Sequence, residues 1–166
     1  MLEKACDPPA ARQLDDRLVI ACGLSCGAAV IHVLAAIGHI QEYALYSVFF
    51  EMLAAGQVAW GVAVYRSPTR RLLGVGAVVS LLVVVLWIVS RTSGLPFGPE
   101  AWRPESVGAV DALATADETL LALLVIRYLR PERNPRLRGA ANQLTFAAGL
   151  VLILLSSVTV LGGAAH

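Results

Sequence analysis

Charge is scarce in this sequence, and that scarcity indicates its class. Asp, Glu, Lys and Arg make up 15% of the 166 residues, whereas about 25% is usual in soluble domains. The net charge is only +1 and no basic run is interleaved with aromatic residues, which argues against a nucleic-acid partner. Hydrophobic residues reach 57% and the mean hydropathy is +0.70. These values are typical of an integral membrane protein.

Signatures of common enzymes are absent as well. The sequence contains no serine-nucleophile motif, no glycine loop that would cradle a phosphate and no haem-attachment motif. Its three cysteines do not form a disulfide framework. Cys22 and Cys26 lack further soft ligands, which favours packing over metal binding. An enzymatic activity would therefore require a bound metal.

Five apolar stretches have the length of a membrane crossing. A helix needs about 20 residues to span a bilayer, and hydropathy places such stretches at roughly 18–40, 43–65, 72–90, 107–129 and 142–163. Backbone groups in lipid must be hydrogen-bonded within the segment, so these stretches should be helices. We therefore predict an all-α bundle of five transmembrane helices over residues 18–163, with residues 1–17 as a short cytoplasmic tail.

The basic residues predict the orientation of the chain. Of the 13 lysines and arginines, 11 lie in the first 17 residues or in and beside the second and fourth connections between the predicted spans, at about 66–71 and 130–141. Only Arg91 and Arg103 lie on the other side. The positive-inside rule then puts the N-terminus in the cytoplasm and the C-terminus outside, in a multi-pass protein of the cell membrane. Four acidic residues among the first 17 argue against a cleavable signal peptide.

Ionisable residues recur at matched depths in this predicted bundle. In the first span, His39 is near the outer surface and His32 lies about 10.5 Å deeper, at a rise of 1.5 Å per residue. The fourth span repeats this spacing with Asp111 near the surface and Glu118 seven residues deeper. Seven residues return to nearly the same helix face. We therefore expect His39 to be level with Asp111, and His32 with Glu118.

Two further ionisable residues join the pattern. Glu51, eight residues into the second span, falls near the lower level, and Arg91 ends the third span at the upper level. Ionisable groups inside a membrane usually face the bundle interior and mark a functional site. They are also compatible with structural pairs that fix helix register without a ligand. Both interpretations stay open at this point.

A metal ion is one candidate ligand. Imidazole and carboxylate groups suit zinc, iron, copper or manganese. The expected ligands are His32, Glu51 and Glu118, with His39 and Asp111 as upper-level ligands or a relay. The sequence has neither Glu-x-x-His nor His-Glu-x-x-His, and the two histidines are too far apart along the helix to share one metal or a haem.

Proton handling is the other candidate for the same residues. Histidine titrates near neutral pH, and chains of Asp, Glu and His relay protons in membrane pumps. The inner half offers no comparable groups, so the site is expected to be a pocket open to the outside. Gln57 in that inner half is expected to form a hydrogen bond between helices.

The third connection, residues 90–108, is expected to cover the site. Its prolines, glycines and aromatic residues indicate an ordered, irregular loop. We interpret it as a lid with Phe97 and Trp102 at the membrane interface. Its charged residues, Glu100, Arg103 and Glu105, would face water or the pocket mouth. An ordinary outer loop with interfacial anchors is the alternative. Arg91 and Gln57 would support the site from below this lid.

The same segment carries a resemblance. Residues 90–99 read SRTSGLPFGP, and residues 104–111 read PESVGAVD, followed by Glu118. This SRTxGLPFGP…PExVGxxD pattern resembles a signature of small multi-pass membrane proteins from high-GC actinobacteria, and the resemblance extends over most of residues 28–122. That group is uncharacterised. The resemblance therefore implies no activity, only that the outer-half residues form one unit.

Two classes of function remain. The first is a membrane protein that binds a metal ion or handles protons at the His and carboxylate site. The second is a non-catalytic membrane subunit or small-ligand binder in which these groups fix helix packing. The expected partners are the lipid bilayer and either further copies of the chain or a larger membrane complex.

Overall fold

The computed structural model describes residues 15–130, 147–149, 151–152 and 155. The continuous helices in this part of the chain are α1 (Asp16–His39), α2 (Ala44–Arg66), α3 (Arg70–Thr92) and α4 (Ala109–Leu129). The short described stretches beyond residue 146 are helical too, and none of the described residues lies in a strand. The all-α prediction is confirmed for these residues, and the first four predicted spans agree with the helices to within a few residues.

Three of these helices, α1, α2 and α3, are long and apolar enough to cross a membrane. α4 does not join them because four of its 21 residues are charged. The predicted fifth span, 142–163, and the predicted tail, 1–17, lie largely outside the described residues. The membrane-protein class is therefore supported, whereas five crossings and the positions of the two termini stay predictions.

Polar side chains cap the starts of three helices. Asp15 and Thr69 accept hydrogen bonds from backbone N–H groups in the first turns of α1 and α3, at 2.9 Å and 3.2 Å. At the start of α4, the Asp111 carboxylate accepts from the Gly108 N–H at 3.3 Å. Such bonds satisfy N–H groups that have no partner within the helix. Each helix start is thus encoded locally.

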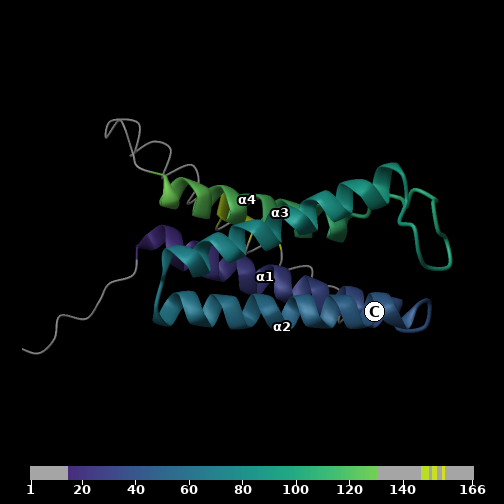
Figure 1. The fold of residues 1–166 in the computed structure, drawn as a ribbon, viewed down its shortest axis with the longest axis horizontal. Helices are drawn as coiled ribbons and strands as arrows, with labels where there is room; N and C mark the ends of the chain where they lie inside the picture. Colours follow the sequence, from purple (N-terminus) through teal and green to yellow (C-terminus); the bar gives the residue numbers. More distant parts are fainter. Residues whose placement is uncertain (1–14, 131–146, 150, 153–154, 156–166) are drawn as a thin grey trace, which may run out of the picture.

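The helices pack as an antiparallel bundle of two pairs (Figure 1). α1 lies against α2 and α4, and α4 lies against α3, whereas α2 and α3 make the least contact of the four neighbouring pairs. The turn 40–43 and the connection 93–108 lie at one end, which we term the loop end. The connection 67–69 lies at the other, which we term the base end. The contact between α2 and α3 is thus the weak side of the bundle.

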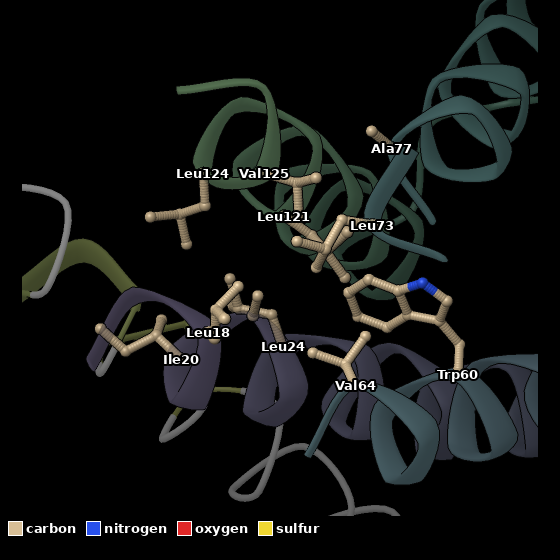
Figure 2. Packing of buried hydrophobic residues seen from close by; sticks show 11 residues of the cluster. Leu18, Ile20, Leu24, Trp60, Val64, Leu73, Ala77, Leu121, Leu124 and Val125 are labelled. Atoms are coloured by element: carbon tan, nitrogen blue, oxygen red, sulfur yellow. The ribbon is translucent and has the colours of Figure 1, made fainter. Parts of the chain in front are cut away.

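A hydrophobic cluster closes the base end (Figure 2). It contains Leu18, Ile20, Ala21 and Leu24 of α1, Trp60 and Val64 of α2, Leu73 and Ala77 of α3, and Leu121, Leu124 and Val125 of α4. The indole of Trp60 reaches from α2 to α3, where its N–H donates to the Leu72 carbonyl at 2.8 Å. This one side chain supplies an interhelical hydrogen bond as well as apolar packing, and it joins the two helices that otherwise touch least.

Replacing Gly76 with alanine should destabilise this end. A Cβ at Gly76 would collide with the ring atoms of Trp60, and overpacking of this kind costs about 1–3 kcal/mol. Gly74→Ala is the matched control, because a Cβ at Gly74 of the same helix meets nothing within 4 Å. Thermal unfolding in detergent should give a lower midpoint for Gly76→Ala than for Gly74→Ala. Equal midpoints would contradict the packing described here.

Candidate functional site

A cavity of about 320 Å³ lies at the loop end of the bundle. All four helices and the connection 93–108 contribute to its walls. Much of the lining is apolar, including Leu45 and Phe49 of α2 and Val83 and Leu86 of α3. α2 and α3 make the least contact of the neighbouring pairs, and both of them line the cavity.

Three buried side chains from three helices form a hydrogen-bonded bridge beside this cavity. Nδ1 of His32 lies 3.0 Å from Oε1 of Gln57, and the Gln57 amide nitrogen donates to Oε1 of Glu118. His32 lines the cavity, and the three residues are 3%, 7% and 1% exposed. The Ser25 hydroxyl donates to the backbone carbonyl of Gln57 at 2.9 Å. The bridge therefore ties α2 to both α1 and α4 at one level.

The carboxyl group of Glu118 is buried to a degree that is rare for this residue type. Its second oxygen, Oε2, has no hydrogen-bond partner among the described residues. The buried Ser80 of α3 lies near this carboxyl group but forms no hydrogen bond with Oε2. Asp117, its neighbour in sequence, is also fully buried. Burying such groups is costly, so an apolar core alone does not account for them.

Aromatic rings form one wall of the cavity. The Phe50 ring lies between His32 and His39, with centroid separations of 5.7 Å and 5.6 Å and interplanar angles of 17° and 15°. Tyr46 meets His39 edge-on at 5.7 Å. Nδ1 of His39 lies 2.8 Å from a carboxylate oxygen of Glu42. Both imidazoles of α1 are thus held by a polar contact on one ring nitrogen and by an aromatic ring from α2.

An ion cluster lies at the mouth of the cavity. The Arg91 guanidinium donates to the carboxylates of Glu105 and Asp111, the latter at 2.6 Å. The Arg91 side chain is only 11% exposed and lies 5.8 Å from the centre of the Trp87 ring. Two carboxylates face one guanidinium here, so this cluster carries an excess of negative charge.

The connection 93–108 folds over this mouth. The Glu105 N–H donates to the Ser90 carbonyl at 3.0 Å, and the Tyr46 hydroxyl donates to the Phe97 carbonyl at 2.9 Å. Gly98 has φ +97°, and a Cβ there would collide with the Tyr46 hydroxyl, so glycine is required for this approach. Phe97 and Glu105 line the cavity. The cover is therefore anchored to both α2 and α3.

Two other residues assigned to the cover lie elsewhere. Glu100 and Trp102 are exposed and do not line the cavity. Trp102 adopts φ +63° with 68% of its surface exposed. An exposed indole at the tip of an ordered connection is typical of an interfacial anchor, and its place at the membrane interface stays a prediction.

The structure brings some predicted site residues together and separates others. His32 and Glu118 share one level, as their spacing predicts, with Gln57 between them. Asp111 does not pair with His39. It binds Arg91, and His39 binds Glu42 instead. The upper level is therefore an ion cluster on α3, α4 and the connection, separate from the polar contact of His39.

The expected metal ligands do not converge. Glu51 is exposed on the outward face of α2 and does not line the cavity, whereas His32 and Glu118 are buried. Across the described ranges, no three His, Cys, Asp or Glu side chains gather closely enough to hold a metal ion. Glu51 was assigned to the site because its depth was right, but depth does not fix the face of a helix.

Gln57 and Phe50 have larger roles than their sequence positions suggested. Seven residues separate them, the same interval that separates His32 from His39 and Asp111 from Glu118. Seven residues return to one helix face, whereas Glu51 follows Phe50 directly and is rotated by about 100° at 3.6 residues per turn. The seven-residue interval between Phe50 and Gln57 was therefore the sequence signal that would have identified the inward face of α2.

No family model, curated protein or solved structure matches this chain. The resemblance to actinobacterial membrane proteins stays a prediction.

Removing Glu118 should weaken the bundle, whereas removing Glu51 should not. Glu118→Ala leaves the Gln57 amide N–H without its acceptor, which should cost about 1–2 kcal/mol. Glu51→Ala removes a carboxylate that is exposed on α2. The measurement is the thermal midpoint of each variant in the same detergent. The bridge would be in doubt if the two variants lost stability equally.

Arg91 should hold the connection closed over the cavity. Arg91→Gln leaves Glu105 and Asp111 without their shared cation, so the connection should open more often. Hydrogen exchange at the Glu105 amide, which donates to Ser90, should become several-fold faster. Arg103→Gln is the control, since Arg103 is an exposed arginine of the same connection. An unchanged exchange rate in Arg91→Gln would show that the ion cluster does not secure the cover.

Proposed function

We propose that this chain is a multi-pass membrane protein that binds a lipophilic small molecule in the cavity at the loop end. The observation that carries the proposal is the cavity itself, with apolar walls and a few polar groups that converge on it. Its volume of about 320 Å³ falls within the range of roughly 300–1,000 Å³ that small-ligand sites occupy. This function corresponds to the small-ligand binder expected as the alternative from the sequence.

The bilayer is the proposed source of the ligand. Leu45 and Phe49 of α2 and Val83 and Leu86 of α3 line the cavity, and these two helices make the least contact of the neighbouring pairs. Both helices also expose large apolar side chains along their lengths, such as Met52, as expected of surfaces that face lipid. A lipid-soluble molecule would therefore enter sideways between α2 and α3 without crossing a polar surface.

We further propose five crossings with the N-terminus in the cytoplasm, which would place the loop end on the outer side of the cell membrane. The distribution of 11 of the 13 basic residues supports this orientation. Glu51 faces outward from α2, where lipid would surround a carboxylate at high cost. The fifth crossing, a second copy of the chain or a larger membrane complex would then cover Glu51.

Filling the cavity should abolish ligand binding. Ala114 of α4 lines the cavity, so Ala114→Phe should reduce binding of lipophilic molecules at least about tenfold, which corresponds to about 1.4 kcal/mol. Ala55→Phe is the matched control, since Ala55 is exposed on α2. Native mass spectrometry of the detergent-purified protein would compare the lipophilic molecules that remain bound. Identical bound species in both variants would contradict a ligand site in the cavity.

A further inference from the structure

Arginines gather at the base end of the bundle, opposite the cavity. Arg66 ends α2, Arg70 and Arg71 begin α3, and Arg127 and Arg130 lie at the end of α4. All five residues are exposed. We term them the arginine cluster. Three helices thus place positive charge at the same end of the molecule (Figure 1).

A tertiary contact joins the two halves of this cluster. Nη2 of Arg70 donates to the backbone carbonyl of Leu129 at 2.9 Å. Leu129 directly precedes Arg130, so the start of α3 lies beside the end of α4. The short connection 67–69 keeps Arg66 next to the start of α3. The five arginines therefore form one patch and not three separate helix ends.

Acidic residues do not balance this charge in the part of the chain that the structure describes. The charged residues described at the base end are six arginines, namely the cluster and Arg17, and two aspartates, Asp15 and Asp16. No arginine of the cluster forms an ion pair with a described carboxylate. Like charges held this close repel one another. An anion placed among them would relieve that repulsion.

Apolar surface continues from the arginines along the same helix faces. Val62 lies four residues before Arg66, and Val75 lies four residues after Arg71. Residues four apart are neighbours on one face of a helix. Val62 is 43% exposed and Val75 is 58% exposed. A soluble anion would contact the arginines alone, whereas an anionic amphiphile would contact the arginines and this apolar surface together.

Tyrosines indicate that the arginine cluster lies at the level of lipid head groups. Tyr65 precedes Arg66 and is 63% exposed, and Tyr128 follows Arg127 and packs against the hydrophobic cluster of the base end. Tyrosine is enriched where the hydrocarbon of a membrane meets its polar surface. α2 and α3 are long and apolar enough to cross a membrane. Their ends therefore bring the arginines to the depth at which lipid phosphates lie.

We infer that the arginine cluster binds the phosphate group of an anionic phospholipid, with the acyl chains of that lipid against Val62 and Val75. The planar guanidinium group of arginine can donate two parallel hydrogen bonds to a phosphate. Basic surfaces beside transmembrane helices attract anionic lipids. A zwitterionic lipid is disfavoured, because its own cation would meet the unbalanced positive charge. This site lies at the opposite end of the bundle from the cavity, so it does not depend on the ligand proposed there.

Native mass spectrometry of the full chain tests the lipid preference. Phosphatidylglycerol and phosphatidylcholine with the same dioleoyl chains are titrated separately into the detergent-purified protein. Phosphatidylglycerol should bind at least about tenfold more tightly. This preference should shrink as the concentration of ammonium acetate is raised, because salt screens interactions between exposed charges.

Arginine variants locate the site. Arg71→Gln removes one charge of the cluster and should weaken phosphatidylglycerol binding about fivefold. Arg103→Gln is the matched control, since it removes an exposed arginine at the loop end, and it should change binding less than about twofold. The double variant Arg66→Gln/Arg71→Gln should weaken binding at least about tenfold. Its thermal midpoint should stay close to that of the parent protein, because neither side chain packs in the hydrophobic cluster.

A photoreactive lipid identifies the contact surface without any substitution. Phosphatidylglycerol with a diazirine in its acyl chain should label α2 and α3 near Val62 and Val75. Labelling confined to the loop end would overturn the inference. Equal affinity for the two lipids, or unchanged phosphatidylglycerol binding in the double variant, would overturn it as well.

Inorganic phosphate distinguishes a lipid site from a site for a soluble anion. At the same concentration as phosphatidylglycerol it should displace little of the lipid, because it lacks the acyl chains. Full displacement would show that the arginines recognise a soluble anion, and the lipid assignment would fail. The cavity at the loop end is tested separately by Ala114→Phe, so the two proposals can fail independently.

Discussion

The buried amide of Gln57 is the interaction on which the loop half of this bundle depends. An amide has both a donor and an acceptor, so Gln57 serves the imidazole of His32 and the carboxyl group of Glu118 at once. An apolar residue in its place would leave both partners unsatisfied within the bundle. Its backbone carbonyl also accepts a hydrogen bond from the Ser25 hydroxyl. These contacts together fix both the rotation of α2 about its own axis and its position along the bundle.

That rotation determines which side chains of α2 reach the site. With Gln57 inward, Phe50 faces α1 and lies between the two imidazoles, and Glu51 is left facing outward. The base end works differently, because Trp60 against Gly76 and the surrounding aliphatic cluster close the space between α2 and α3. The bundle is thus tightly packed with apolar side chains at one end, whereas the other end is hollow and carries the buried polar bridge. The hollow end is where a site for another molecule can exist.

Much of the fold could be predicted from the sequence. The runs of apolar residues place the ends of the helices within a few residues. The common level of His32 and Glu118 followed from equal spacing on two antiparallel helices. These features are properties of single segments or of their lengths, so they do not depend on how neighbouring helices are turned.

The pairing of side chains could not be predicted in the same way. Glu51 was expected inside because it is ionisable at the right depth, and Gln57 was ranked below it because amides are common in helix contacts. Asp111 was matched with His39 by depth, yet Arg91 reaches it from α3, and Glu105 of the connection completes that cluster. Each of these pairings depends on how a helix is rotated about its own axis or on the path that a connection follows.

By itself the sequence determined that the chain is helical, apolar and suited to a membrane, with polar residues concentrated toward one end. Hydropathy and helical rise are properties of a single segment, so they can be assigned from its residues without knowing which helices lie beside it. Only the tertiary structure decided which faces meet, because the rotation of a helix about its axis is set by the best simultaneous packing of all its neighbours. That rotation made Gln57 the centre of a bridge, turned Glu51 outward and left a cavity at the loop end that all four helices line.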